Sequence, residues 1–504
     1  MRFQPILLLR VIVIIIMGLW TACALQQAPP SKPASEAVEK VKKKKVEGPY
    51  FYLPTLALGE EREPYVSWAS WDRDTKQFDV YVSRSQTAGR SWLAAVSVNP
   101  DRSQNIGGRH ILAGEKGDVY ALWASGLRTK GNEIVFARSE DRGASWTAPM
   151  SIHTSRKLYP PRFIRNSRGV LYAVMPEGSE IHWTLAFARS SDGGKSWETL
   201  PKLPSAQGTD TIYGIRDSSA VADDQGQIHV VWQERGNPPR ERIYYNRFVP
   251  ATGNGGSWLS QPIQLSMGGP DSFGAYHPKI SIDREGHVFV VWVEAWNPQV
   301  PRFEGRHPQA VHFNRSMDSG TSWLPQPIQL SESGPSSIKL VATSAEVADN
   351  GKGHVYVAWR VEDGFPATER IMFARSLDYG SIWTSVPQRL YQNTPWPIIM
   401  DRLYLRAGGA DNVYLLWQMV GGSDWKLLFS RSGDGGQSWL EKPLRLASLP
   451  QSYRNAHNLS LETGGPYLYV AWDGGTREPS DIFLNRSEDF GMTWLSEEVQ
   501  VSRR

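Results

Sequence analysis

The chain repeats one short motif eight times. Six copies have the form Ser-x-Asp-x-Gly-x-x-Trp, and two degenerate copies have Thr87 and Gly253 at the Asp position. Consecutive motif tryptophans are 51 to 65 residues apart, at Trp92, Trp146, Trp197, Trp258, Trp323, Trp383, Trp439 and Trp494. A period of this length, kept from one end to the other, indicates a repeat architecture in which each repeat is one supersecondary unit.

Each repeat contains the signals of four β-strands. An apolar stretch with a Gly-rich turn (280–286) precedes a strand that usually ends in an aromatic residue (288–292). A third strand (371–376) leads into the motif, and we expect the Trp to open a fourth, as in 439–446. Runs of Val, Ile, Tyr and Phe between Gly, Asp and Asn predict strands and hairpins, and no helical period follows residue 50. The sequence predicts an all-β, single β-propeller of four-stranded antiparallel blades, eight in number, or seven if the Trp258 repeat is an insertion.

The motif resembles the Asp-box of the bacterial neuraminidase repeat, and the resemblance covers about nine-tenths of the chain. It implies a propeller of the sialidase-like superfamily, in which Gly permits positive φ and Asp accepts hydrogen bonds from its own turn. The Trp would pack between units. The superfamily includes sialidases, other glycosidases, photosystem II assembly factors and sortilin-type receptors, so the fold does not select a function. The six Asp residues expected to be structural are Asp141, Asp192, Asp318, Asp378, Asp434 and Asp489.

The N-terminus predicts export. Residues 1–22 have a positive start and an apolar stretch of signal-peptide length, and they precede Cys23, the only cysteine of the chain. This arrangement resembles a bacterial lipoprotein signal, which implies a lipid on Cys23 and an outer-membrane, periplasmic or surface-facing protein. Residues 23–47 are rich in Ala, Pro, Ser, Glu and Lys, and we interpret them as a flexible tether. Residues 48–504 form the propeller.

The charge balance excludes a nucleic-acid partner. Residues 42–45 are four lysines, but a solvated spacer beside an anionic bilayer is the simpler interpretation. Residues 48–504 contain 47 basic and 48 acidic side chains, so the propeller has no bulk positive field. The expected partners are the membrane, through the lipid anchor, and a glycan or protein ligand.

An arginine also recurs on the strand before every motif. A sialidase grips a carboxylate with three arginines, but a residue present in all eight repeats more plausibly pairs with the turn or with the neighbouring blade. We therefore predict a structural role for Arg84, Arg138, Arg189, Arg247, Arg315, Arg375, Arg431 and Arg486.

Function is expected where the repeats differ. The fifth repeat has 23 residues between Trp292 and Arg315, against 14 to 16 in the others, and the extra loop, 294–308, mixes aromatic, acidic and basic residues. This loop and the blade-to-blade connections share one face, which suits a polar ligand with an apolar side. A solvated surface loop is the alternative. The candidate ligand-binding residues are Tyr213, Arg216, Asp217, Tyr276, His277, Glu294, Trp296, Arg302, Arg306 and His307.

Two hypotheses of different class follow. In the first, the protein is a tethered binding or assembly module; in the second, it is a sialidase-like glycoside hydrolase acting at the same face, with Glu294, Glu234 and Asp363 as weak catalytic candidates. The Arg-Ile-Pro signature of sialidases is absent, and residues 162–165 (Arg-Phe-Ile-Arg) are the nearest approach, which favours binding. No cofactor is expected, and no metal, because no His/Cys cluster has ligand spacing.

Overall fold

The described part of the chain consists of strands and connecting turns. The computed structural model describes residues 49–100, 106–126, 132–178, 183–206, 214–235, 240–267, 272–296, 309–331, 340–363, 368–393, 399–409, 411–421, 424–447, 455–475 and 480–502. All of them belong to one unit, residues 46–504. No helix among them is long and apolar enough to cross a membrane. The signal peptide, Cys23 and the tether lie outside the described residues.

The described strands form seven sheets, which we divide into eight consecutive antiparallel sets and number as blades 1 to 8. Blades 5 and 6 belong to one sheet, because Gln309 and Val341 pair in parallel between them. Blades 1 to 4 comprise β1(Tyr50–Leu58), β2(Pro64–Asp72), β3(Gln77–Arg84), β4(Val96–Ser97); β5(Ile106–Ala113), β6(Val119–Ser125), β7(Asn132–Ser139), β8(Met150–Ser155); β9(Arg162–Arg165), β10(Leu171–Gly178), β11(Trp183–Ser190), β12(Glu198–Thr199); and β13(Ile215–Ala222), β14(Ile228–Arg235), β15(Glu241–Pro250), β16(Gly256–Trp258), β17(Ile263–Gln264). Blades 5 to 8 comprise β18(Ser272–Ile282), β19(Val288–Trp296), β20(Gln309–Ser316), β21(Ile328–Gln329); β22(Leu340–Asp349), β23(Val355–Asp363), β24(Thr368–Ser376), β25(Gln388–Gln392); β26(Ile399–Gly408), β27(Asn412–Gly421), β28(Asp424–Ser432), β29(Leu444–Arg445); and β30(Asn455–Gly464), β31(Tyr467–Gly475), β32(Asp481–Ser487), β33(Val499–Gln500). The predicted all-β propeller of four-stranded antiparallel blades is confirmed.

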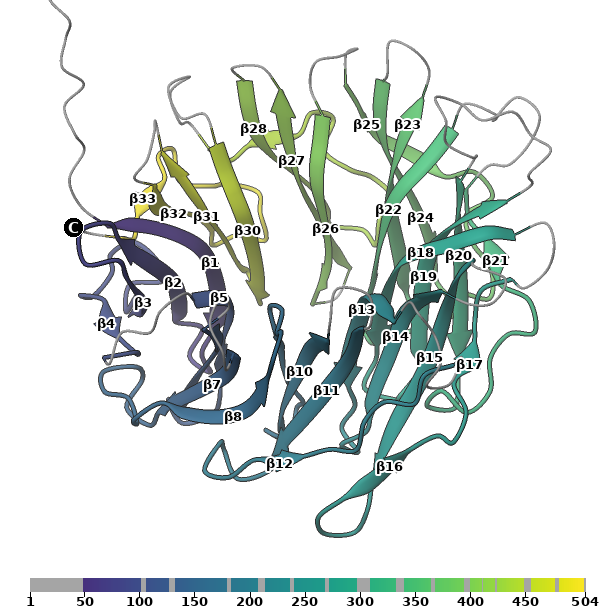
Figure 1. Cartoon of the computed structure of the whole chain (residues 1–504). Helices are drawn as coiled ribbons and strands as arrows, with labels where there is room; N and C mark the ends of the chain where they lie inside the picture. The colour runs from purple at the N-terminus through teal and green to yellow at the C-terminus, as the bar shows by residue number, and fades with distance from the viewer. Residues whose placement is uncertain are drawn as a thin grey trace, which may run out of the picture. The chain divides into compact units, whose positions relative to one another are not determined.

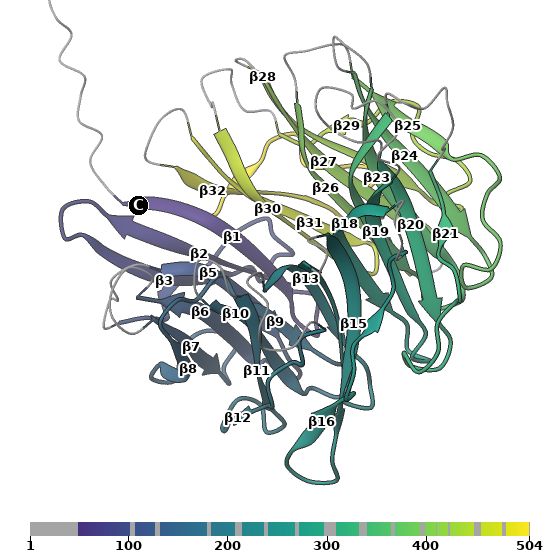
Figure 2. The same ribbon diagram turned by 45° about the vertical axis from the view of Figure 1, so that its right-hand side comes forward.

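The blades follow one another around a ring, and the last blade packs against the first (Figures 1 and 2). Hydrogen bonds between blade 1 and blade 8 close the ring. Phe51 N–H donates to Ser480 O at 3.1 Å, and Leu56 N–H donates to Ser460 Oγ at 3.1 Å. The buried apolar residues of the described chain form clusters that each combine two neighbouring blades, including one shared by blades 8 and 1. The hydrophobic core is therefore divided among the blade junctions.

The motif forms a tight turn between the third and fourth strands, which we call the Asp turn. In blade 2, Asp141 accepts hydrogen bonds from Ser145 N–H at 2.8 Å and from the hydroxyls of Ser145 and Ser139. The bonds from Ser145 lower the pKa of Asp141 to about 2. The same pattern of bonds to the Asp carboxylate recurs at Asp192, Asp318, Asp434 and Asp489. At Asp378 the hydroxyl that corresponds to Ser145 is missing, and only the backbone N–H of that position donates. These carboxylates are fully used within their own turns.

The Asp turns also pack against the preceding blade. The ring of Trp197 packs edge-on against Phe136 with centroids 5.0 Å apart, and Trp383 packs in the same way against Phe313 at 4.8 Å. A Cβ at the turn glycine Gly380 would lie 2.5 Å from the Phe313 ring, and φ there is +81°, so both packing and backbone require glycine.

The recurring arginine joins the same junction. Arg315 Nη1 donates to Tyr379 O at 2.6 Å in the next blade's turn, and Arg375 Nη1 donates to Gly435 O at 2.8 Å. Because the guanidinium donors reach backbone carbonyls of the neighbouring blade, the expected structural role of these arginines agrees with the geometry.

One expectation was wrong. We predicted that the motif Trp opens the fourth strand, as in 439–446, but in blade 7 the fourth strand is only β29(Leu444–Arg445). The Trp439 ring instead packs against Phe373 of the preceding blade at 5.0 Å. The residue contributes to the blade junction, and its backbone does not need to pair.

The Asp turn of blade 6 lacks one hydroxyl donor, which leads to a stability prediction. Ile382 stands where the other well-formed turns have Ser or Thr, and its side chain is 74% exposed. Ile382→Ser restores a donor to Asp378, and we expect it to raise the free energy of unfolding by about 0.5–1 kcal/mol. Denaturant unfolding measures the change. The matched reverse substitution Ser438→Ile should lower stability; equal midpoints for all three proteins would contradict the role of the hydroxyl.

Candidate functional site

The register of the strands assigns the connections to two faces. In blade 5, Ser272 at the start of the inner strand pairs with Trp296 at the end of β19, and Ala295 pairs with Gln309 at the start of β20. The blade-to-blade connections and the connections between second and third strands therefore lie on one face, which we call the loop face. The Asp turns lie on the opposite face.

Most inner strands carry a β-bulge near the loop face. The register shifts by one residue in β1, β5, β13, β18, β22, β26 and β30, for example between Tyr276 and Lys279 in β18. Side chains of a regular strand point alternately to the two faces of its blade, and both faces pack against neighbouring blades. The side chains of a regular inner strand are therefore buried between blades and cannot contact a ligand. A bulge leaves one residue unpaired and re-aims its side chain, which is why bulges are common beside functional sites.

Asp217 and His277 contact each other beside the bulges of two neighbouring inner strands. Asp217 lies in β13 and His277 in β18, and His277 Nδ1 is 3.0 Å from Asp217 Oδ2. The His277 side chain is 54% exposed and that of Asp217 36% exposed. His277 has φ +54°, in the left-handed region that non-glycine residues rarely adopt. Burial opposes ionisation of Asp217, yet the bond from His277 and the charge of Lys279 lower its pKa. An ionised carboxylate and an imidazole are thus presented on the loop face.

Polar contacts continue from one inner strand to the next. Lys279 Nζ forms an ion pair with Glu346 Oε1 at 3.2 Å, and Tyr404 O–H donates to Leu459 O at 3.0 Å. Arg109 Nη2 donates to Tyr52 O at 2.6 Å near the ring closure. These contacts mix both signs of charge, so the centre of the ring offers individual hydrogen-bonding groups and no large field of one sign.

Glu234 and Glu294 are internal. Trp232 Nε1 donates to Glu234 at 2.7 Å, and Trp292 Nε1 donates to Glu294 at 2.9 Å. Ser205 Oγ and Ser272 Oγ donate to the same two carboxylates at 2.5 Å and 2.6 Å. We call this Trp-x-Glu arrangement the Glu latch, because it ties the second strand to the start of the inner strand of the same blade or to the connection that enters it.

The Glu latch changes the interpretation of both glutamates. Their side chains are 1% and 0% exposed, and burial raises the pKa of Glu294 although Ser272 and Trp292 donate to it. From the sequence we predicted Glu294 as a ligand-binding residue and Glu294 and Glu234 as catalytic candidates. The structure places them in the interior, with their oxygens occupied, because each carboxylate satisfies a buried indole N–H.

The other predicted site residues divide into three groups. Tyr276 is half-buried, and its ring centroid is 6.5 Å from that of His277. Arg216, Trp296 and Asp363 lie within β13, β19 and β23, but only their backbone is described. The residues outside the described part of the chain are Tyr213, Arg302, Arg306 and His307.

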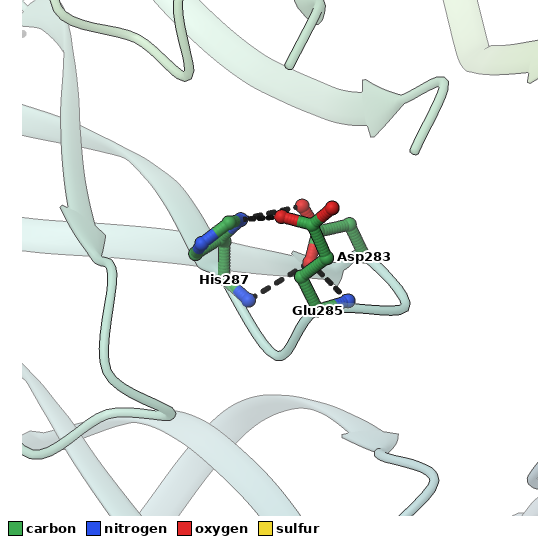
Figure 3. A group of neighbouring side chains, drawn as sticks. All are labelled: Asp283, Glu285 and His287. Atoms are coloured by element: carbon green, nitrogen blue, oxygen red, sulfur yellow. Dashed lines mark hydrogen bonds and ion pairs between the residues drawn. The ribbon is translucent and has the colours of Figure 1, made fainter. Parts of the chain in front are cut away.

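One group on the opposite face has the composition of a cation site. The ligand atoms of Asp283, Glu285 and His287 lie within 4.8 Å of one another (Figure 3). Asp283 Oδ1 accepts from His287 N–H at 2.9 Å, and Asp283 Oδ2 is 2.8 Å from His287 Nδ1. Asp223 makes the same turn in blade 4, where Gln227 stands in place of histidine. The bonds of Asp283 are therefore those of a β-turn, which accounts for the position of this carboxylate without a bound cation.

Comparisons with known proteins give only distant likenesses to solved structures. No family model and no curated protein matches the chain. An ulvan lyase, described as a PL25 polysaccharide lyase bound to -[GlcA(1-4)Rha3S]-, is 12% identical with a TM-score of 0.47 over 90% of this chain and 97% of its own. The Penicillium chrysogenum α-L-arabinanase complexed with arabinobiose is 14% identical, with a TM-score of 0.40 over 66% and 93%. The Hadza microbial sialidase Hz136 is 16% identical, with a TM-score of 0.34 over 62% and 63%. At these identities the likeness concerns the fold alone.

The Glu latch predicts that Glu294 stabilises the folded protein. Glu294→Gln removes one acceptor oxygen from a buried site with three donors, so we expect a loss of about 1–3 kcal/mol in the free energy of unfolding. Glu285→Gln, at an exposed carboxylate of the same blade, is the matched control and should be near neutral. Urea denaturation measures both. A Glu294→Gln protein as stable as the wild type would argue against the latch.

Proposed function

We propose that the protein is an envelope-attached propeller that binds a glycan on its loop face, at the inner strands of blades 4 and 5. The observation that carries the proposal is the exposed Asp217–His277 pair, in which two bulged strands present an acceptor and an imidazole side by side. Carboxylates and imidazoles bind sugar hydroxyls with directed hydrogen bonds, and the half-buried ring of Tyr276 offers an apolar surface for a sugar face.

Binding is favoured over hydrolysis because most of the candidate acidic side chains already have partners within the protein. An inverting hydrolase needs two carboxyl groups about 6.5–9.5 Å apart across the bond, and a retaining one needs them about 5–5.5 Å apart. Glu234 and Glu294 are held in their latches, and Glu346 is paired with Lys279. Asp217 is ionised and exposed, so a sialidase-like glycoside hydrolase at the same face is the second candidate. A protein ligand at this face is a further alternative.

The binding proposal is tested with substitutions at the exposed pair. His277→Ala and Asp217→Asn remove the imidazole and the carboxylate, and each should weaken binding to glycans retained by the wild type at least tenfold. An array of neutral and acidic oligosaccharides identifies the glycans, and biolayer interferometry gives the Kd. His287→Ala, on the Asp-turn face, is the matched histidine control. Unchanged affinity in both loop-face variants would refute the site. Release of reducing sugar by the wild type, lost in Asp217→Asn, would favour the hydrolase.

The envelope attachment rests on Cys23 and makes a separate prediction. If residues 1–22 are removed and a lipid is added to Cys23, the protein should incorporate labelled palmitate and sediment with membranes. Cys23→Ser has no thiol to modify, so both properties should be lost while the propeller still folds. Detergent phase partitioning of cell fractions measures the change. Equal membrane association of Cys23→Ser and wild type would contradict the lipid anchor.

A further inference from the structure

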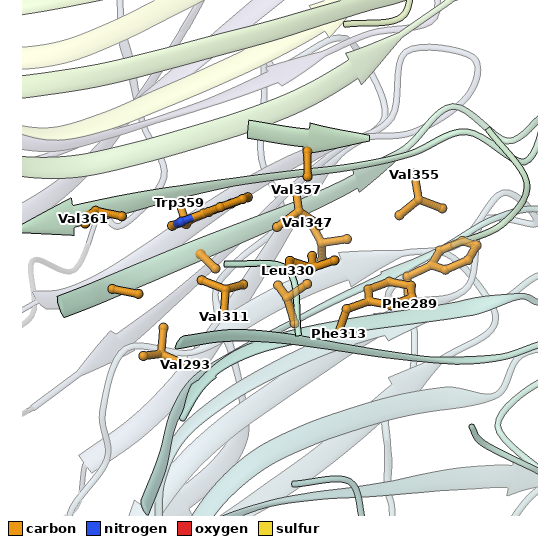
Figure 4. Packing of buried hydrophobic residues seen from close by; sticks show 14 residues of the cluster. Phe289, Val293, Val311, Phe313, Leu330, Val347, Val355, Val357, Trp359 and Val361 are labelled. Carbon is orange, nitrogen blue, oxygen red and sulfur yellow. The ribbon is translucent and has the colours of Figure 1, made fainter. Parts of the chain in front are cut away.

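A cavity of about 90 Å³ lies between blades 5 and 6, on strands other than those that carry Asp217 and His277. It occupies the part of this junction nearest the loop face, because Gln309 begins β20 and Val361 and Arg370 lie near the ends of β23 and β24 on that side. The apolar cluster shared by blades 5 and 6 forms its floor (Figure 4). Its lining residues are Gln309, Ser331, Ala342, Trp359, Val361, Arg370, Met372 and Pro387.

The cavity lies beside the position that the latch glutamate occupies in blades 4 and 5. Blade 6 lacks the latch, as do blades 1, 2, 7 and 8, where Ser70, Ser125, Met419 and Gly474 stand two positions after the tryptophan. In blades 4 and 5 the residue two positions after the buried tryptophan is a glutamate, and its carboxylate accepts the indole N–H. In blade 6 that position is Val361, which offers no acceptor to Trp359. The Trp359 ring has its nitrogen at the end nearer Val361 in Figure 4. Val361 is shorter than glutamate and apolar, so it leaves space beside Trp359 and gives the indole N–H no carboxylate acceptor.

The walls define the chemistry of an occupant. Ala342, Val361, Met372, Pro387 and the Trp359 ring are apolar. Two polar members offer only donors, because Arg370 carries a guanidinium and Trp359 an indole N–H, while the Gln309 amide and the Ser331 hydroxyl offer both roles. A cavity of about 150 Å³ holds a benzene ring. The present volume therefore admits the carboxylate-bearing edge of a sugar ring, with the remainder of the ring at the mouth.

We propose that this cavity binds the carboxylate of a uronate residue, with the acid group in the position beside the indole N–H that the latch glutamate occupies in blades 4 and 5. The carboxylate accepts from Trp359 Nε1 and from Arg370, and the ring edge lies against Val361 and Met372. The inference rests on the proposed function in that it names an acidic glycan as the ligand class, and it adds a second subsite one blade away from Asp217 and His277.

The latch of blades 4 and 5 suggests a substitution that should block the cavity of blade 6. Val361→Glu rebuilds the latch of blades 4 and 5, fills the cavity and gives Trp359 an internal acceptor. Isothermal titration with free D-glucuronate and D-galacturonate, with D-glucose as the neutral probe, measures the cavity directly. We expect uronate to bind at least tenfold more tightly than glucose, and Val361→Glu to weaken uronate binding at least tenfold without lowering Tm. Arg370→Gln, which removes the charge, should weaken uronate binding and leave the weak glucose signal unchanged.

Two results would overturn the inference. One is wild-type binding of a polymeric glycan without measurable binding of either free uronate; the proposed function would then stand without this subsite. The other is uronate binding that persists in both Val361→Glu and Arg370→Gln, which would place the acid elsewhere. If uronate binds and Val361→Glu abolishes it, but no polymer binds, the cavity is supported and the proposed glycan function falls.

Discussion

The ring depends on the contact between each Asp turn and the blade before it. The Trp383 ring and Gly380 both pack against Phe313, and Arg315 donates to the backbone of the same turn. A propeller has no single central core, so each junction must bury enough apolar surface to hold two blades in register. The motif performs this task repeatedly: a carboxylate shapes the turn, a glycine allows close approach, and an aromatic ring fills the junction.

This architecture limits where a ligand can bind. Both faces of each blade are used in packing, and the Asp carboxylates are used within their turns, so chemistry must come from irregular positions on the loop face. The bulges that expose Asp217 and His277 are one such irregularity. The cavity beside Val361 and Trp359 is another, because Val361 stands where blades 4 and 5 have the latch glutamate. Both lie on strands near the loop face.

The fold could be predicted because the motif solves a local problem at every turn. The site was harder to predict. Asp217 and His277 were expected on one face from the strand order, but their contact depends on bulges, and a one-residue shift in register leaves no clear trace in the sequence. Glu294 and Glu234 looked like exposed acids because they precede variable connections. Their recurrence as Trp-x-Glu in two neighbouring repeats was the available sign of a structural role, of the kind already applied to the recurring arginines. The fourth strand was misjudged because a tryptophan that packs between blades resembles one that begins a strand.

The central claim is that the ligand binds on the loop face, at the Asp217–His277 pair and in the cavity beside Trp359. A crystal structure of the protein soaked with a uronate-containing oligosaccharide tests it most directly. The account predicts density for sugar rings over the inner strands of blades 4 and 5, in contact with His277, and a carboxylate in the cavity beside Trp359. Sugar bound only at the Asp-turn face, with the His277 side chain and the cavity vacant, would contradict it.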